Sequence, residues 1–203
     1  MKIEMLIKPF LLVIFIVCSG SALQNGKSSI SRWVITGDGS LKVGGSTNMN
    51  KFSCDITNFL SPDTILINKN FSLETIKMSG SMQLDIKRFD CNNIVMTKDL
   101  RKALKARDFP RMRIRFISLG WHSESNGNAN EVTGLVSISL AGITKKFEVN
   151  YTVIYKGANS MQLKGTRRIT FSDFSIIPPG KLGGMLKAHN DLNVEFNLSL
   201  AQL

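Results

Sequence analysis

The segment Phe89–Phe116, FDCNNIVMTKDLRKALKARDFPRMRIRF, decides how the rest of the chain must fold. It contains a cysteine, an amphipathic helical pattern, a Phe-Pro break and an alternating strand pattern. The sequence on either side is mostly strand-like. Because a lone helix in a strand-rich chain has to pack on a sheet, we expect this segment to cover one end or one gap of a β structure.

The helix is predicted over residues 97–106, with Thr97 as its N-cap. Met96, Leu100 and Leu104 recur at i, i+4 and i+8 and form a narrow apolar stripe. A narrow stripe is typical of a helix that lies on a surface rather than inside a core.

Alternating apolar and polar residues predict strands over most of the remaining chain. Residues 57–70 are predicted to be a loop, Ser79-Gly80-Ser81 a turn between two strands, and Gly165 a bulge or crossing point. The expected strands are 31–36, 41–43, 52–56, 71–78, 82–89, 110–116, 132–140, 147–155, 161–171 and 192–200.

Long strands with one apolar face must pack as two sheets or close on themselves. A closed barrel of about eight strands has room for one small ligand. We therefore predict an all-β fold, a single extended antiparallel barrel of about eight strands with one short helix packed against it.

Residues 1–22 have the features of a cleaved signal peptide. Lys2 and Lys8 precede an apolar run, Phe10–Val17, which is too short to span a bilayer, and small residues end at Ala22. We expect an exported protein, periplasmic or secreted, with one domain over residues 23–203.

Cys18 offers an alternative, because a lipoprotein acceptor cysteine also follows an apolar run. The residues before Cys18 are bulky, however, which favours the cleaved peptide. The mature chain then keeps Cys54 and Cys91, and two cysteines in an exported chain usually pair. Two buried free thiols are the alternative.

The chain lacks the common catalytic and nucleotide-binding motifs. It has no HExxH, CxxC, GxSxG, GxxxxGK[ST] or strand-linked GxGxxG pattern. We assign no catalytic residue, no metal and no cofactor. An enzyme would have only His122 and His189 as candidate bases.

The formal net charge of +11 is concentrated around the predicted helix. Arg101, Lys102, Lys105 and Arg107 form a predicted basic rim that would attract an acidic head group or an anionic membrane. A solvated face is the alternative. Nucleic acid is not an expected partner, because no aromatic residues interleave these charges. No oligomeric state is predicted.

Four segments and a following Pro178-Pro179 together resemble the YceI-like family of exported, lipocalin-like barrels. The resemblance runs from Trp33 to Leu200, and Phe171 stands where the family commonly has arginine. The segments are LKVGGSTNMNKF (41–52), Cys91–Phe116 with its DFPRMRIRF, GLVSISLAGITK (134–145) and GTRRITFSDF (165–174).

The resemblance implies non-enzymatic binding of a long amphiphile, such as a polyisoprenoid or fatty-acid-like lipid, inside the barrel. An interaction module with a filled barrel, docked by its basic face on an anionic membrane or acidic partner, is the alternative. The candidate ligand contacts are Met82, Leu84, Ile86, Ile114, Phe116, Val136, Ile138, Phe147, Val149, Tyr151, Val194 and Phe196.

Overall fold

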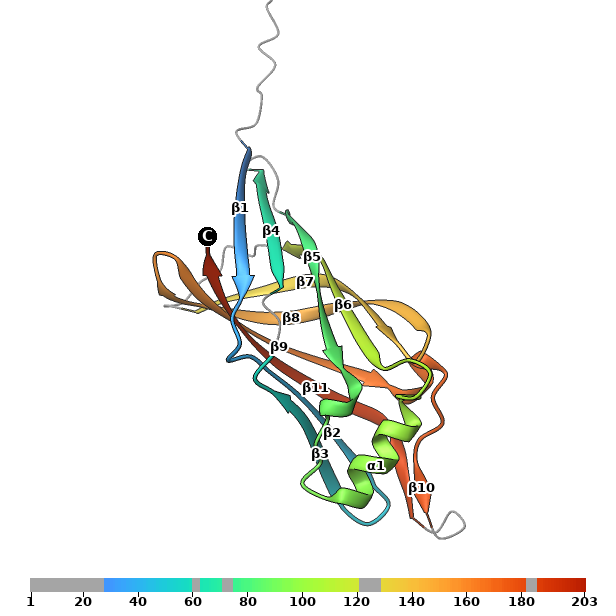
Figure 1. The fold of residues 1–203 in the computed structure, drawn as a ribbon. Coiled ribbons are helices and arrows are strands. Elements are labelled where there is room, and N and C mark those ends of the chain that lie inside the picture. The colour runs from blue at the N-terminus through green and yellow to red at the C-terminus, as the bar shows by residue number, and fades with distance from the viewer. Residues whose placement is uncertain (1–27, 60–62, 71–74, 121–128, 182–185) are drawn as a thin grey trace, which may run out of the picture.

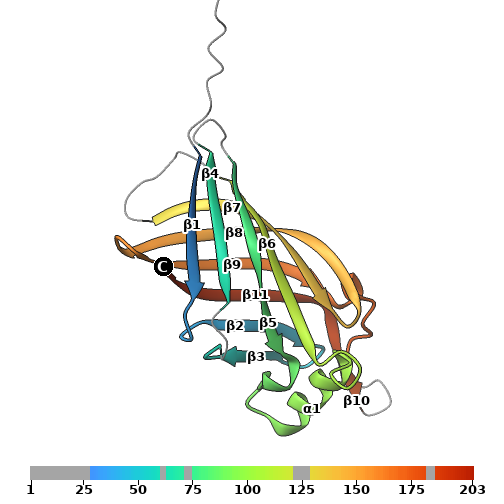
Figure 2. The same ribbon diagram turned by 45° about the horizontal axis from the view of Figure 1, so that its top comes forward.

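Antiparallel strands close into a barrel in the computed structural model, which describes residues 28–59, 63–70, 75–120, 129–181 and 186–203. Within these residues the ring order is β1-β4-β5-β6-β7-β8-β9-β11, and β11 pairs back onto β1. In Figures 1 and 2, the wall of β1, β4, β5 and β6 crosses the wall of β7, β8, β9 and β11. The prediction of a single antiparallel barrel of about eight strands with one short helix is confirmed.

The elements, in chain order, are β1 (Ser28–Ile35), β2 (Ser40–Thr47), β3 (Lys51–Thr57), β4 (Thr64–Asn70), β5 (Thr75–Asp85), η1 (Ile86–Arg88), α1 (Ile94–Ala103), β6 (Arg111–Gly120), β7 (Ala129–Leu140), β8 (Ile143–Gly157), β9 (Ser160–Thr170), η2 (Phe171–Phe174), β10 (Gly180–Lys181) and β11 (Leu186–Gln202).

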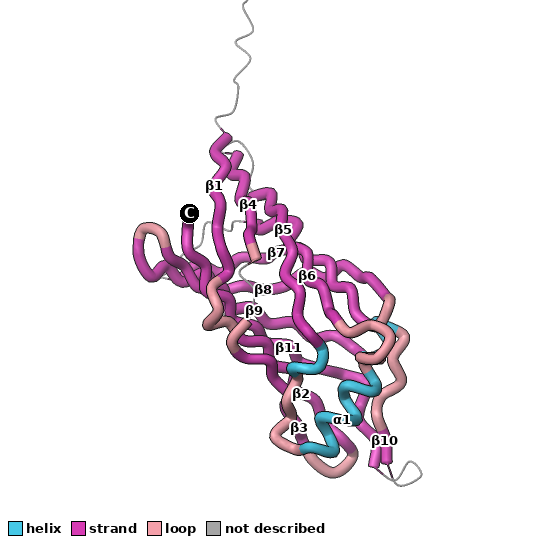
Figure 3. Tube along the Cα trace, viewed as in Figure 1, coloured by secondary structure: helices cyan, strands magenta, loops and turns pink. Residues whose placement is uncertain are grey.

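Different strands complete the barrel wall at its two ends, because β11 changes its neighbour along its length. The C-terminal end of β11 pairs with β1, whereas its earlier part pairs with β2, which in turn pairs with β3. On the other side, β4 pairs with only the first half of β5. Thus β1 and β4 fill the space between β11 and β5 at one end, and β2 and β3 do so at the other. Figure 3 shows all the helical turns at this second end.

The free edge of β3 is joined to the chain after β5 by the residues we call the β3–α1 junction: Cys54, Asp55, Asp90 and Cys91. Asp55 and Asp90 exchange two backbone hydrogen bonds, with N–O distances of 2.8 and 2.9 Å. Cys54 and Cys91, both buried, form a disulfide, as predicted. Arg88 adds hydrogen bonds from Nη2 to the carbonyl oxygens of Thr57 and Asn58, at 2.8 Å each. This short contact is what closes the wall between β3 and β5.

The helix α1 begins three residues earlier than predicted, and its N-cap is Asn93 rather than Thr97. The Asn93 side chain accepts a hydrogen bond from the amide of Met96 at 3.0 Å. Thr97 is buried, and its hydroxyl oxygen accepts from the amide of Cys91 at 3.0 Å. The Thr97 prediction was wrong because a second preferred capping residue lies upstream, and the threonine instead ties the helix to the disulfide.

The strand β4 occupies the second half of the segment predicted to be a loop. Its Ile65 and Ile67 are buried, and it pairs with β1 along its whole length. Only two apolar residues alternate here, which is too short a pattern to distinguish a strand from a loop.

The predicted turn at Gly80 is also wrong, because β5 runs through it with a shift in pairing register. Gly80 has a φ of 149°, and a Cβ there would lie 2.5 Å from the carbonyl oxygen of Thr64. Both conditions require glycine. The strand then ends at Asp85 and continues as η1, so it is shorter than predicted.

Replacing Cys54 and Cys91 together with alanine should lower the free energy of unfolding by about 2–4 kcal/mol, because the disulfide closes a long loop. The sequence separation of the two cysteines is 37. Denaturant unfolding measures the change. Reduction should destabilise the wild type to a similar extent and leave the double variant unaffected; a double variant as stable as the oxidised wild type contradicts the role of the junction.

Arg101→Ala should lower the free energy of unfolding by about 1–2 kcal/mol, because a half-buried carbonyl loses its charged donor. The Nε and Nη2 atoms of Arg101 donate to the Phe89 carbonyl oxygen at 3.2 and 2.8 Å. Lys102→Ala, at the next and exposed position, is the matched control and should change stability by less than about 0.5 kcal/mol. Equal effects of the two substitutions would show that the Arg101 contact is unimportant.

Candidate ligand-binding cavity

The inward faces of the ring strands carry the apolar half of each alternating pattern. On β7, Val136 and Ile138 point inward, whereas the intervening Ser137 belongs to the outer face. On β11, Val194 and Phe196 point inward and the intervening Glu195 is exposed. Period-two patterning thus gives a barrel with an apolar interior.

The interior contains a cavity at the end of the barrel next to α1, and the surface exposed to it is apolar. Its volume, measured as the space open to the centre of a water-sized sphere, is about 70 Å³. One water needs about 10–15 Å³ on this measure, so the void is larger than a single-water defect. The lining residues are Leu41, Val43, Phe59, Met82, Leu84, Phe89, Leu100, Leu104, Met112, Ile114, Phe116, Val136, Ile138, Leu140, Val149, Arg167, Ile169, Phe171, Phe174, Leu192, Val194, Phe196 and Leu198.

At the end of the barrel completed by β1 and β4, which we call the β1–β4 end, many inward side chains are also buried. Those that do not line the cavity include Trp33, Ile35, Ile65, Ile67, Met78, Leu119, Val132, Val153, Met161, Leu163 and Leu200.

Two aromatic rings lie in contact at the cavity wall, and of the two only the ring of Phe196 lines the cavity. The rings of Tyr151 and Phe196 meet edge to face, with centroids 5.3 Å apart. Phe196 lies over Gly165, where a Cβ would be only 2.2 Å from its Cζ atom. Gly165 is therefore neither a bulge nor a crossing point, since the pairing of β9 runs through it without a shift, but a space for this ring. Burial raises the pKa of Tyr151 far above its usual value.

The structure places most of the sequence-predicted contacts on the cavity wall and three of them elsewhere. Ile86, Phe147 and Tyr151 are buried but do not line the cavity: Ile86 lies in η1, the Phe147 ring packs on Phe174, and the Tyr151 ring packs on Phe196. The role of the others as ligand contacts stays a prediction. Those that line the cavity are Met82, Leu84, Ile114, Phe116, Val136, Ile138, Val149, Val194 and Phe196.

Sequence reasoning missed lining residues from outside the main strand pattern. Leu100 and Leu104 of α1 belong to the predicted apolar stripe and reach the cavity, so the helix is part of the wall and not only a cover. Phe171 and Phe174 contribute from η2, for which no strand periodicity gives a signal. Arg167 was missed because charge argues against an inward position.

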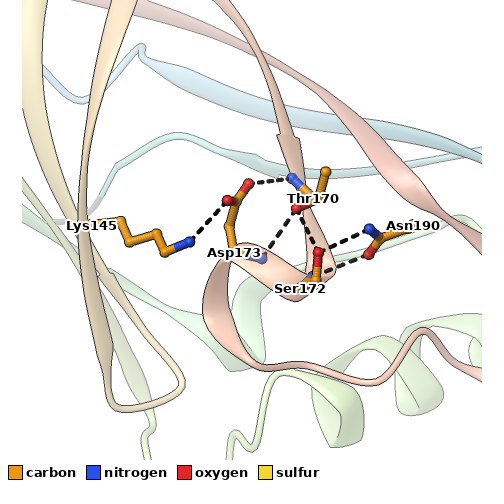
Figure 4. Close-up of polar contacts among 5 residues, drawn as sticks. All are labelled: Lys145, Thr170, Ser172, Asp173 and Asn190. Carbon is orange, nitrogen blue, oxygen red and sulfur yellow. Dashed lines mark hydrogen bonds and ion pairs between the residues drawn. The ribbon is translucent and has the colours of Figure 1, made fainter.

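The η2 corner is held by polar contacts at the end of β9 (Figure 4). The Asp173 carboxylate accepts from the Thr170 amide at 2.8 Å and from Lys145 Nζ at 3.1 Å. Burial acts to raise the pKa of Asp173, but the hydrogen bonds from Thr170 and the charge of Lys145 outweigh it and lower the pKa. On the other side, Asn190 hydrogen-bonds the amide and hydroxyl of Ser172. These contacts fix Phe171 and Phe174 in the cavity wall.

The basic rim differs from the prediction at one residue. Lys102, Lys105 and Arg107 are exposed, as expected, but Arg101 is half-buried against the Phe89 carbonyl. Its guanidinium therefore stabilises the packing of α1 against the chain at Phe89.

The described segments contain few candidate residues for catalysis or metal binding. No three His, Cys, Asp or Glu side chains of this part of the chain are grouped to hold a metal ion. His189 is exposed and hydrogen-bonds Ser46 at 3.0 Å, away from the cavity wall, and His122 lies outside the described residues. Within those residues, no helix has the length and apolar character needed to cross a membrane.

Neither a family model nor a curated protein matches this sequence. Solved structures do match its fold. BcnA of Burkholderia cenocepacia has a TM-score of 0.59 at 16% identity, covering 79% of this chain and 95% of its own. A polyisoprenoid binding domain from Saccharophagus degradans has a TM-score of 0.59 at 10% identity, covering 86% and 100%. The Campylobacter jejuni YceI protein has a TM-score of 0.51 at 12% identity, covering 100% and 93%.

This chain has a YceI-like fold. The resemblance seen in the sequence is thereby confirmed at the level of the fold. In this YceI-like barrel, the segment Phe89–Phe116 begins at the C-cap residue of η1 and contains the helix and the first part of β6. It contributes side chains to the cavity from each of these parts.

Asp173→Asn should lower the free energy of unfolding at neutral pH by about 1 kcal/mol, because it weakens a capping box and removes an ion pair. A carboxylate with a lowered native pKa stabilises the fold above its unfolded pKa, and this stability is lost as the pH falls through the native value. The difference between variant and wild type should therefore shrink below about pH 4. Denaturant unfolding across pH checks this. The exposed Asp108→Asn is the control, and a pH-independent difference contradicts the assignment.

Proposed function

We propose that this protein binds the apolar chain of a long amphiphile in its cavity and does so without chemical change to the ligand. The observation that carries the proposal is a cavity with an apolar surface inside a closed barrel. Empty apolar space forfeits dispersion contacts, and each CH₂ that a ligand buries there gains about 0.8 kcal/mol.

Several lining side chains are only partly buried, namely Val43, Ile114, Ile138, Val194 and Phe196. They face the void from β2, β6, β7 and β11, so uncovered apolar surface surrounds the cavity on both walls. The void is narrow, and a chain of many carbons needs these side chains to change rotamer. We therefore expect the cavity to widen when a ligand enters.

The choice of a polyisoprenoid as the first ligand to test is supported by the comparison. One structure with this fold is a polyisoprenoid binding domain, and fatty-acid-like lipids satisfy the same apolar lining. The proposed site of action is outside the cytoplasm, in the periplasm or beyond it. The Cys54–Cys91 disulfide supports this location, because such bonds persist in oxidising compartments.

A second candidate function is docking on an anionic membrane or acidic partner. The observation favouring it is exposed basic charge, with Lys102 in the last turn of α1, Lys105 and Arg107 just after it, and Arg111, Arg113 and Arg115 on the outer face of β6. Binding of this kind collapses at high salt, because exposed charges are screened within about 10 Å at 0.1 M.

Organic extraction of the purified protein followed by mass spectrometry should find a stoichiometric amphiphile, and the extracted protein should take up added polyprenol. Ile138→Trp should reduce this uptake at least tenfold, because the indole fills the void. Ser137→Trp, at the neighbouring outward position, is the matched control and should bind normally.

An extracted protein that takes up neither polyprenols nor fatty acids contradicts the proposal. Equal uptake by the Ile138→Trp and wild-type proteins would show that ligand binds elsewhere. If only anionic vesicles bind, and only at low salt, the docking function is the correct one.

A further inference from the structure

One charged residue, Arg167, lines an otherwise apolar cavity. It occupies an inward position of β9, between the buried Gly165 and Ile169, and pairs with the inward-facing Val194 of β11. A charge in such a position is costly unless it is solvated or paired. Because Arg167 is also exposed, its side chain lies where the cavity meets solvent.

The cavity meets solvent at an interruption in the barrel wall. The pairing of β8 with β9 starts at Asn150–Thr166. Residues 143–149 of β8 and 167–170 of β9, all within the described chain, form no backbone pairs with each other. Past this interruption, Lys145 reaches Asp173 and reconnects β8 to η2 (Figure 4). We call the unpaired region between these two connections the β8–β9 window.

Arg167 and Phe147 face each other across the window. The guanidinium carbon of Arg167 lies 6.0 Å from the ring centroid of Phe147, within the range of a cation–π contact. The Phe147 ring packs in turn on Phe174, with centroids 5.8 Å apart, and Phe174 lines the cavity. The rings of Phe174 and Phe147 thus connect the cavity wall to the Arg167 guanidinium at the cavity edge.

The two cations at the window differ in whether they have an acidic partner. Lys145 is paired with Asp173 at 3.1 Å. Among the described residues, no carboxylate lies within ion-pair distance of Arg167. A guanidinium carries five N–H donors in a planar arrangement that matches carboxylate and phosphate oxygens. Arg167 therefore retains donors for an anion, whereas the charge of Lys145 is engaged in the fold.

We infer that Arg167 binds the anionic head group, a phosphate or carboxylate, of the amphiphile whose apolar chain occupies the cavity. The inference rests on the proposed function and specifies the ligand class. The chain lies against the apolar wall, and the head group remains at the β8–β9 window, where it keeps contact with water. Neutral amphiphiles gain the burial of the chain but not this charge-assisted hydrogen bond.

Calorimetric titration with a matched pair of probes, farnesyl monophosphate and farnesol, tests the inference on the delipidated full-length mature protein. The wild type should bind the phosphate about tenfold more tightly than the alcohol. Arg167→Gln should remove this preference and leave the affinity for farnesol within about twofold. Arg168→Gln, at the adjacent exposed position outside the cavity wall, is the matched control and should keep the preference. Thermal unfolding verifies that both variants are folded.

Retention of the preference for the phosphate in Arg167→Gln, or its equal loss in Arg168→Gln, overturns the assignment of Arg167 as the head-group site. Neither outcome contradicts the proposed binding of the apolar chain in the cavity. Failure of every protein to bind either probe overturns the proposed function and this inference with it. Inorganic phosphate alone, titrated as a third probe, should bind too weakly to detect. Arg167-dependent binding of free phosphate at the affinity of the farnesyl ester would identify a phosphate site and overturn the amphiphile assignment.

Discussion

The cavity end of this barrel depends on the β3–α1 junction. Because β11 exchanges β1 for β2 along its length, the wall at this end finishes on the free edge of β3. The Asp55–Asp90 backbone pair and the adjacent disulfide join that edge to the chain leaving β5. The same residues anchor α1, since the Cys91 amide donates to Thr97 inside the helix. Leu100 and Leu104 are thereby held in the cavity wall.

The barrel uses its interior in two ways. At the end next to α1 the described residues surround a void with an apolar surface, and at the β1–β4 end they include many buried side chains that do not line it. The rings of Phe196 and Tyr151 are in contact, and the absence of a side chain at Gly165 leaves room for the Phe196 ring. A protein that needs only stability gains nothing from such a void, because unfilled apolar space costs packing energy. The cavity is thus the structural basis on which we propose a ligand-binding function.

Much of this architecture can be predicted from the sequence because alternation reports which face of a strand is buried. The strands after Pro110 are long enough for that pattern, and their inward residues Ile114, Val136 and Val194 do line the cavity. Ile86 and Tyr151 satisfy the same pattern but lie beyond the void, because alternation gives direction and not depth. Alternation does not reveal the β8–β9 window or the place of Arg167 beside it, because the window forms where β8 and β9 stop pairing. The helix start was misplaced because Asn93 and Thr97 are both acceptable caps.

The central claim is that a ligand chain occupies the cavity next to α1 and not the β1–β4 end, and methionine methyl NMR tests it most directly. Met82 and Met112 line the cavity, Met78 and Met161 are buried outside its lining, and Met49 is exposed on the surface. On titration with a polyprenol or its phosphate, the account predicts large shifts of the Met82 and Met112 methyl signals. The signals of Met78, Met161 and Met49 should stay nearly unchanged. Shifts confined to Met49, or no shift at Met82 and Met112 at saturating ligand, would contradict it.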